Sequence, residues 1–147
     1  MRSLIAGFGL GVSLVTLAIG AAVAASAPAP TPTVIKDATG ATFTGDATAG
    51  ENSFRQCAAC HKIEVGKNGI GPSLHGVVGR KAGTLAGYNF SGPMKNSGLT
   101  WNEQTLSEYL ENPRKKVAGT KMTYAGMRKP QDRANVIAYI KKASAPK

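Results

Sequence analysis

Two cysteines and a histidine stand close together in the segment Cys57-Ala58-Ala59-Cys60-His61. This spacing is typical of a c-type haem attachment site, where each thiol adds to one vinyl group of the porphyrin. When such a segment is helical, the histidine that follows is carried under the ring and can ligate the iron. The pattern therefore predicts one covalent haem c, attached through Cys57 and Cys60, with His61 as an iron ligand.

The same cysteines allow two other interpretations. Because the sequence holds no further cysteine, Cys57 and Cys60 could form a single strained disulfide of the kind used in thiol–disulfide exchange. The βαβ pattern expected around a thioredoxin-like motif is absent. A zinc site would have only these cysteines, His61 and His75, and His75 fits a hydrogen-bonding role in its turn better than a ligand role. Both interpretations are therefore weaker than the haem.

Composition constrains the partners. The 147 residues carry a formal net charge of +10, which favours acidic partners. The basic residues form short clusters with few aromatic residues among them, so the sequence argues against nucleic-acid binding. The content of hydrophobic residues, 42%, is enough for a packed core, but aromatic residues make up only 6%. A large apolar cofactor would complete such a core.

The first part of the chain predicts targeting and tethering. Residues 1–25 contain a weakly apolar stretch, from Leu4 to about Ala25, that suits either a signal peptide or an uncleaved membrane anchor formed by residues 4–25. Ala22-Val23-Ala24 offers the small-x-small pattern of a cleavage site. Residues 26–44 are rich in Ala, Pro and Thr and predict a flexible or polyproline-like linker. Residues 45–147 are then the haem domain.

Helix signals divide that domain. Asp46 or Thr48 is expected to cap a first helix that runs into the cysteine motif. The stretch 77–98 lacks periodicity and predicts an extended loop that wraps an object. Thr100 and Glu103 have the spacing of a capping box, with Thr100 as the cap.

The C-terminal half predicts two further helices around one short one. The helix after the capping box carries Leu106, Tyr109 and Leu110 on one face, and Asn112-Pro113 starts the short helix. The last helix is expected from Pro130 to about Lys142. Its buried face is predicted to hold Val136, Ile137, Tyr139 and Ile140, and Arg133 is predicted to face water.

Several residues could serve a haem. A ligating imidazole needs an acceptor for its other ring nitrogen, and a carbonyl near Pro72 could hold that of His61. Arg80 could pair with a carboxylate such as a haem propionate, and the N–H of Trp101, the only tryptophan, needs a partner if it is buried.

The iron would need a second axial ligand. Met122 lies in a loop bounded by Gly119 and Gly126, away from helical core spacing, and is the favoured thioether ligand. Met94 and Met127 are the rival sulfur ligands.

In this order, the motifs resemble class I cytochrome c, of the bacterial kind close to the mitochondrial carrier. The resemblance covers about residues 45–143. The matching segments are Cys57-Ala58-Ala59-Cys60-His61, Gly71-Pro72-Ser73-Leu74-His75-Gly76, Gly79-Arg80-Lys81, Leu99-Thr100-Trp101, Tyr109-Leu110-Glu111-Asn112-Pro113 and Gly119-Thr120-Lys121-Met122. The family implies a small all-α fold with three main helices and short ones around the haem. Its first and last helices would cross near Gly50, Phe54 and Tyr139.

The resemblance also implies roles for single residues. His61 and Met122 would be the axial ligands, with the Pro72 carbonyl on the His61 ring. The side chains implied near the propionates are Arg80, Tyr88 and Trp101, and those implied near the second ligand are Tyr109 and Thr120. The lysines implied around the exposed haem edge, for docking, are Lys62, Lys115, Lys116, Lys121 and Lys129.

Three positions depart from the family pattern. Ala118 stands where a proline usually stiffens the loop, and this predicts that the Met122 loop opens more easily. Phe90 replaces a tyrosine whose hydroxyl reaches a propionate. Tyr124 replaces a phenylalanine, so its hydroxyl needs water or a partner.

The leading functional hypothesis is one-electron transfer between Fe(II) and Fe(III), with no enzymatic reaction. By resemblance, the partners are acidic patches on a cytochrome bc complex and on a terminal oxidase or photosynthetic reaction centre. A peroxidase-like side activity after opening of the Met122 loop is the alternative. The protein is expected to be a monomer in the periplasm, soluble after signal cleavage or tethered to the inner membrane.

Overall fold

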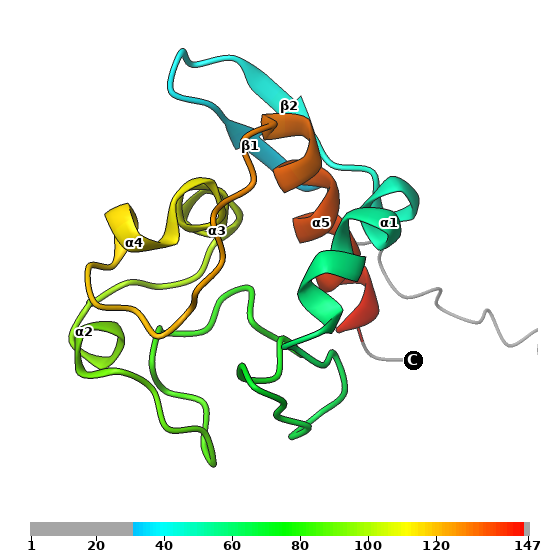
Figure 1. The fold of residues 1–147 in the computed structure, drawn as a ribbon. Coiled ribbons are helices and arrows are strands. Elements are labelled where there is room, and N and C mark those ends of the chain that lie inside the picture. Colours follow the sequence, from blue (N-terminus) through cyan, green and yellow to red (C-terminus); the bar gives the residue numbers. More distant parts are fainter. Residues whose placement is uncertain (1–30, 146–147) are drawn as a thin grey trace, which may run out of the picture.

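Three helices form the main body of the protein, with a hairpin and two short helices around them (Figure 1). The computed structural model describes residues 31–145. Its elements are β1 (Val34–Lys36), β2 (Thr42–Thr44), α1 (Ala47–Ala58), α2 (Gly92–Lys95), α3 (Glu103–Glu111), α4 (Pro113–Lys116) and α5 (Pro130–Ala143). The helices agree with the predicted all-α architecture, whereas the two-stranded sheet was not expected. The predicted targeting segment, residues 1–25, lies outside the described residues.

Helices α1 and α5 cross at close range. Asp46 caps α1 by accepting hydrogen bonds from the backbone N–H groups of Thr48 and Ala49. A Cβ atom at Gly50 would stand 2.0 Å from the backbone oxygen of Asn135, so only glycine permits this approach. One turn later the Phe54 ring packs against Tyr139 with ring centroids 5.2 Å apart. The predicted crossing of the first and last helices is thus present.

Helix α3 begins differently from the prediction. Its N-cap is Asn102, whose side chain accepts from the Thr105 N–H at 2.7 Å, and not Thr100. An Asn at this position satisfies the free N–H groups of the first turn as well as a threonine does. Glu103 is therefore the first helical residue, and its carboxylate pairs with Lys141 Nζ at 2.5 Å. That ion pair joins α3 to α5.

Arg133 of α5 is buried, and the prediction that it faces water is wrong. Its side chain donates to Ser107 Oγ at 3.0 Å and to the Met127 carbonyl at 2.8 Å, and Nη2 lies 3.6 Å from a carboxylate oxygen of Glu111. A buried guanidinium is tolerated when its donors find acceptors in this way. Arg133 thereby connects α5 to α3 and to the segment before α5.

Part of the segment expected to be a flexible or polyproline-like linker instead forms a hairpin, over residues 34–44. Strands β1 and β2 pair antiparallel, with Ile35 opposite Phe43. Ile35 is 1% exposed and belongs to the core. The Lys36 backbone exchanges hydrogen bonds with the Gln104 side chain of α3, donating at 2.8 Å and accepting at 3.1 Å. A single buried apolar residue in a three-residue strand is too little for a sequence pattern to reveal.

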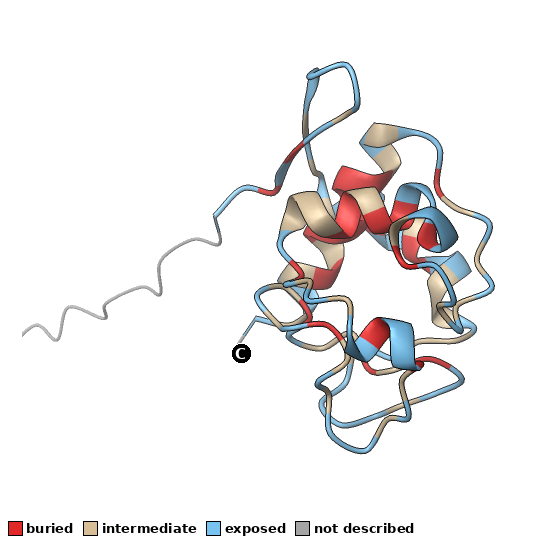
Figure 2. Cartoon of the chain, turned by 90° about the vertical axis from the view of Figure 1, so that its left-hand side faces the viewer, coloured by how far each residue is buried: buried red, intermediate tan, exposed pale blue. Residues whose placement is uncertain are grey.

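The long connection between α1 and α3 is mostly loop, as predicted for residues 77–98, but it contains α2. Ser91 caps this short helix, and Met94 on it is buried. Many of the buried residues lie on α5 and α3, and Figure 2 shows buried residues concentrated where the helices pack together. No helix in residues 31–145 is long and apolar enough to cross a membrane.

Candidate haem-binding site

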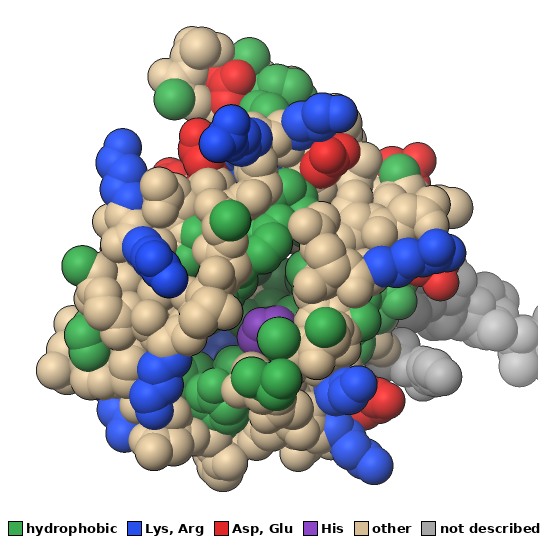
Figure 3. All heavy atoms as spheres, viewed as in Figure 1, with side chains coloured by type: hydrophobic (Ala, Val, Ile, Leu, Met, Phe, Trp, Pro, Cys, Tyr) green, Lys and Arg blue, Asp and Glu red, His purple; other side chains and the backbone are tan. Residues whose placement is uncertain are grey.

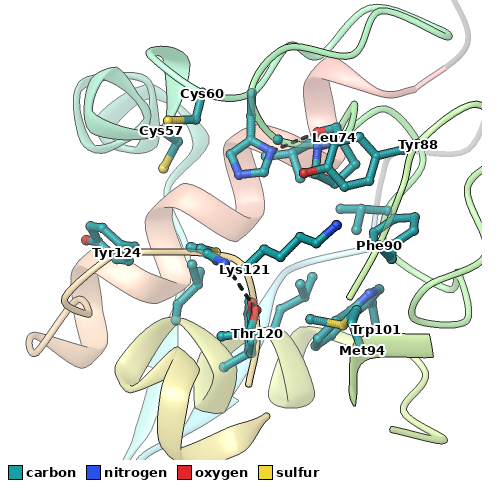
Figure 4. Close-up of a pocket in the computed structure, with 18 of the residues that line it drawn as sticks. Cys57, Cys60, Leu74, Tyr88, Phe90, Met94, Trp101, Thr120, Lys121 and Tyr124 are labelled. Carbon is teal, nitrogen blue, oxygen red and sulfur yellow. Dashed lines mark hydrogen bonds between the residues drawn. The ribbon is translucent and has the colours of Figure 1, made fainter. Parts of the chain in front are cut away.

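A cavity of about 320 Å³ lies between the end of α1, the long loop, α3, α5 and the segment before α5 (Figure 4). Its lining is mainly apolar. All ten residues predicted to bind the cofactor line it: Cys57, Cys60, His61, Pro72, Arg80, Tyr88, Trp101, Tyr109, Thr120 and Met122. Figure 3 shows the opening as a hollow with apolar side chains and a histidine inside it and basic side chains around it.

The cysteine motif occupies the end of α1. The N–H groups of Cys60 and His61 both donate to the Cys57 carbonyl, at 3.1 and 2.9 Å, so the motif forms a helical turn. Both thiols reach the cavity (Figure 4). Burial, and to a lesser degree the neighbouring Cys60, raises the pKa of Cys57 to about 11. Exchange-active cysteines have lowered pKa values, so this environment does not suit thiol–disulfide exchange.

The His61 ring is fixed by the chain eleven residues further on. Its Nδ1 lies 2.7 Å from the Pro72 carbonyl oxygen, which can only accept, so Nδ1 carries the proton and Nε2 keeps a free lone pair. Burial lowers the pKa of His61, although the bond to Pro72 opposes the shift. The neutral form that results is the one that binds metals. Gly71 leaves room for the ring, since a Cβ there would stand 2.3 Å from His61 Cε1.

Met122 reaches the cavity from the segment before α5. The Tyr109 hydroxyl lies 2.8 Å from Thr120 Oγ1, and the same oxygen accepts from the Met122 N–H at 3.3 Å. These contacts join the Met122 segment to α3. The rival Met94 is also in the cavity lining, whereas Met127 is buried outside it.

The three side chains predicted to lie near the propionates, Arg80, Tyr88 and Trp101, all line the cavity. Arg80 donates to the carbonyls of Ser73 and His75 at 3.0 and 3.1 Å, and the Tyr88 hydroxyl donates to the Ile70 carbonyl at 2.9 Å. Trp101 is buried, with its ring centroid 5.0 Å from that of Tyr109. Their proximity to propionates stays a prediction.

The structure shows the environment of the three residues that depart from the family pattern, Ala118, Phe90 and Tyr124. Ala118 is exposed. Phe90 packs edge-on against Tyr88, with centroids 4.7 Å apart, so an aromatic contact stands in place of a hydroxyl. The Tyr124 hydroxyl finds a protein partner, Gln56, at 2.7 Å. Burial is the main cause that raises the pKa of Tyr124.

Sequence reasoning missed several lining residues. Gln56 was overlooked, although its position directly before Cys57 could have drawn attention to it. Gly71 was read only as part of a motif, yet a glycine before the proline that orients the histidine is a usable signal. The apolar faces predicted for α3 and α5 also supply a wall of the cavity, a role that the sequence did not assign to them; its members are Leu106, Leu110, Val136, Ile137 and Ile140.

The residues present fit a c-type haem. Two thiols three positions apart, an oriented neutral imidazole and a thioether all border one apolar cavity, and the absent side chain of Gly71 accommodates the imidazole. Zinc is less suitable, because the described residues contain no group of three or more His, Cys, Asp or Glu side chains able to hold a metal ion.

Comparison with known proteins agrees with this donor set. The family model described as cytochrome c matches residues 47–144. The chain belongs to the cytochrome c family. It is 58% identical over 89 residues to cytochrome c2 iso-2 of Magnetospirillum fulvum, covering 60% of this chain and 93% of that protein. It is 54% identical over 102 residues to cytochrome c2 of Rhodoblastus acidophilus, covering 69% and 95%.

A solved structure gives the same result for the fold. Cytochrome cH from Methylobacterium extorquens is 52% identical, with a TM-score of 0.64, and the match covers 67% of this chain and 99% of that one. The predicted class I cytochrome c fold and the haem cofactor are confirmed. Membership of this family makes the chain a haem-based electron carrier and not an enzyme. The β1–β2 hairpin lies outside the residues that the family model matches.

Proposed function

We propose that this cytochrome carries single electrons from a cytochrome bc complex to a terminal oxidase or a photosynthetic reaction centre. The observation that supports this proposal is the meeting of Cys57, Cys60, His61 and Met122 at one apolar cavity in a strongly basic chain. The bound haem would supply an Fe(II)/Fe(III) couple, which methionine–histidine ligation and an apolar pocket bias towards the reduced state.

The protein contributes a fixed environment to that couple. Cys57 and Cys60 would hold the cofactor covalently, so it is retained in both oxidation states. The Pro72 carbonyl keeps the His61 ring in one tautomer and one orientation. Thr120 and Tyr109 hold the segment that carries Met122. Ligands that stay in place during electron transfer leave little to reorganise, which favours fast exchange.

Exposed lysines would steer the haem edge towards acidic partners. Lys62, Lys115, Lys121 and Lys129 are exposed, and Lys121 also lines the cavity and donates to the Asn89 carbonyl at 2.9 Å. Lys116 differs from the others because its Nζ pairs with Glu108 at 2.6 Å. We therefore expect Lys116 to contribute least to docking. Such contacts are small and electrostatic, which suits rapid association and release by a monomer.

The same proposal places the protein in the periplasm. The predicted signal peptide or anchor in residues 1–25 supports export of the haem domain, and covalent haem attachment to two thiols is compatible with an exported chain. A retained anchor would tether the carrier to the inner membrane, and the length of the intervening chain would then set its reach. Mass spectrometry of the mature N-terminus distinguishes cleavage from tethering.

Reduction by a purified cytochrome bc complex tests the proposal. We expect the second-order rate constant to fall steeply as ionic strength rises, because added salt screens the lysines from acidic groups. Lys62→Gln should lower the rate at low salt and flatten its salt dependence. Lys142→Gln, which removes an exposed lysine outside the predicted docking set, is the matched control. A salt-independent rate with both donor and acceptor would rule out electrostatic docking.

A further inference from the structure

The segment that carries Met122 is fastened to α1 by one side-chain contact. The Tyr124 hydroxyl donates to Gln56 Oε1 at 2.7 Å, although the two residues are 68 positions apart. Tyr124 follows Met122 by two positions, and Gln56 directly precedes Cys57. Figure 4 places Tyr124 on the same side of the cavity as Cys57. The contact therefore joins the regions that supply two different attachments for the cofactor.

Little else holds the chain just after Met122. Within the described residues, the segment 123–126 makes no backbone hydrogen bond to the rest of the protein, and its one side-chain hydrogen bond is that of Tyr124. Backbone pairing resumes at Met127, whose N–H donates to the Leu110 carbonyl at 2.7 Å. On the other side of Met122, Thr120 is held by Tyr109. The Tyr124–Gln56 bond thus holds the chain between Thr120 and Met127, which are each held by hydrogen bonds of their own.

The backbone before Met122 has no proline to restrict it, although Lys121 there donates to the Asn89 carbonyl at 2.9 Å. Ala118 is exposed and leaves its backbone free, where a proline would restrict the open states of the loop. Gly119 adopts a positive φ of 82°, which glycine reaches without strain. The Tyr124 ring is half buried and packs against the core. Because the ring is already held in place, its hydroxyl can bond to Gln56 with little further loss of side-chain freedom.

We propose that Tyr124 and Gln56 form a latch that keeps the Met122 segment closed over the cavity. Both are positioning residues, since they act through Met122. The latch compensates for the missing proline at residue 118 and limits access of small ligands to the iron. This inference depends on the proposed function for the haem and its Met122 ligand, but not for the docking partners, so the two can fail separately.

Imidazole binding to the oxidised holoprotein measures loop opening. Imidazole entry would replace the proposed bond between iron and the Met122 sulfur by a bond between iron and an imidazole nitrogen, without electron transfer. The reaction is monitored by the loss of the methionine–iron charge-transfer band. Tyr124→Phe and Gln56→Leu should each accelerate binding about two- to tenfold, the range expected for one hydrogen bond. The double variant should bind no faster than the faster single variant, because both changes remove one contact.

Two further variants separate a latch from a general structural effect. Gln56→Glu retains an acceptor for the tyrosine hydroxyl and should bind imidazole at nearly the original rate. Tyr139→Phe removes a hydroxyl from a tyrosine that does not line the cavity and should leave the rate unchanged. Hydrogen exchange at the two hydrogen-bonded amides that flank the contact, those of Met122 and Met127, should accelerate in Tyr124→Phe and in Gln56→Leu alike.

Several results would overturn the latch. These are unchanged binding in Tyr124→Phe, additive effects in the double variant, or equal acceleration by Gln56→Glu and Gln56→Leu. If the unmodified holoprotein showed no methionine–iron band, that absence would instead contradict the assignment of Met122 as a ligand. Loss of salt-dependent reduction with normal imidazole kinetics would contradict only the docking proposal.

Discussion

His61 Nδ1 lies 2.7 Å from the Pro72 carbonyl oxygen, and the residue before that proline has no side chain. A Cβ atom at Gly71 would meet three atoms of the His61 ring, at 2.3 to 2.8 Å. The loop that orients the imidazole therefore also has to make room for it. One short segment of sequence, Gly71-Pro72, does both.

Gly71→Ala should displace the His61 ring and strain the loop. We expect a loss of about 1–3 kcal/mol in the free energy of unfolding of the holoprotein, since overpacking at a closed site costs that much. The reduction potential should also change, because the ring no longer has its fixed acceptor. Gly92→Ala is the matched control, as a Cβ at Gly92 meets no atom within 4 Å. Equal stability losses in the two variants would contradict the steric account.

Removal of the Met122 sulfur should abolish the methionine–iron charge-transfer band and lower the reduction potential, because a thioether ligand favours Fe(II). Met122→Leu keeps the volume of the side chain nearly constant. Met94→Leu tests the rival that also lines the cavity, and it should keep the band. If Met94→Leu lost the band and Met122→Leu kept it, the ligand would be Met94. Visible absorption spectra of both oxidised variants decide the point.

Ile35 attaches the N-terminal hairpin to the core, so Ile35→Ala should lower the free energy of unfolding by about 2–5 kcal/mol. The neighbouring Val34 is 44% exposed, and Val34→Ala should change stability by less than about 0.5 kcal/mol. Denaturant unfolding of the two holoproteins gives both values. Equally small effects would mean that the hairpin is not part of the cooperative unit.

Glu103 predicts an acid-dependent contribution to stability. Burial is the largest single influence and works to raise the pKa of this carboxyl. The hydrogen bond from Lys141, a backbone hydrogen bond at Glu103 itself and the charge of Lys141 together outweigh burial and hold the pKa below its ordinary value of 4.5. A lowered folded-state pKa stabilises the fold above the unfolded-state pKa and loses that contribution as pH falls through the folded-state value.

Glu103→Gln should therefore cost about 0.2–1 kcal/mol at pH 7 and little at about pH 3. Unfolding measured at both values checks this. Glu51→Gln, at an exposed position of α1, should show no comparable difference. A Glu103→Gln penalty that grows towards acid would have the wrong sign for this account.

Residue types and spacing, with the family resemblance, were sufficient to predict α1, α3, α4 and α5 and ten residues of the cavity, but not α2. Cys57, Cys60 and His61 form a local motif, and the remaining lining residues stand in recognisable segments. The family resemblance implied a helix crossing near Gly50, and a glycine inside a helix fits that expectation because it needs a packing reason. Such features depend on residues that are close together in the sequence, so a sequence pattern can reveal them.

Features that depend on distant partners could not be predicted. Arginine is usually a surface residue. Arg133 can be buried only because Ser107 and the Met127 carbonyl accept its hydrogen bonds and Glu111 lies near its charge. The hairpin is stabilised by hydrogen bonds to the Gln104 side chain and by burial of Ile35 in the core, and not by a strong preference of its short strands for extended backbone. The Tyr124–Gln56 contact joins residues 68 positions apart that carry no shared pattern.

A spectroelectrochemical titration of the purified full chain, combined with its intact mass, tests the central claim most directly. We predict one haem per chain, retained under denaturing conditions, no alkylatable thiol at Cys57 or Cys60, and a reversible one-electron transition with the methionine–iron band in the oxidised form. Free thiols at both cysteines, or the absence of a reversible one-electron transition, would contradict the account.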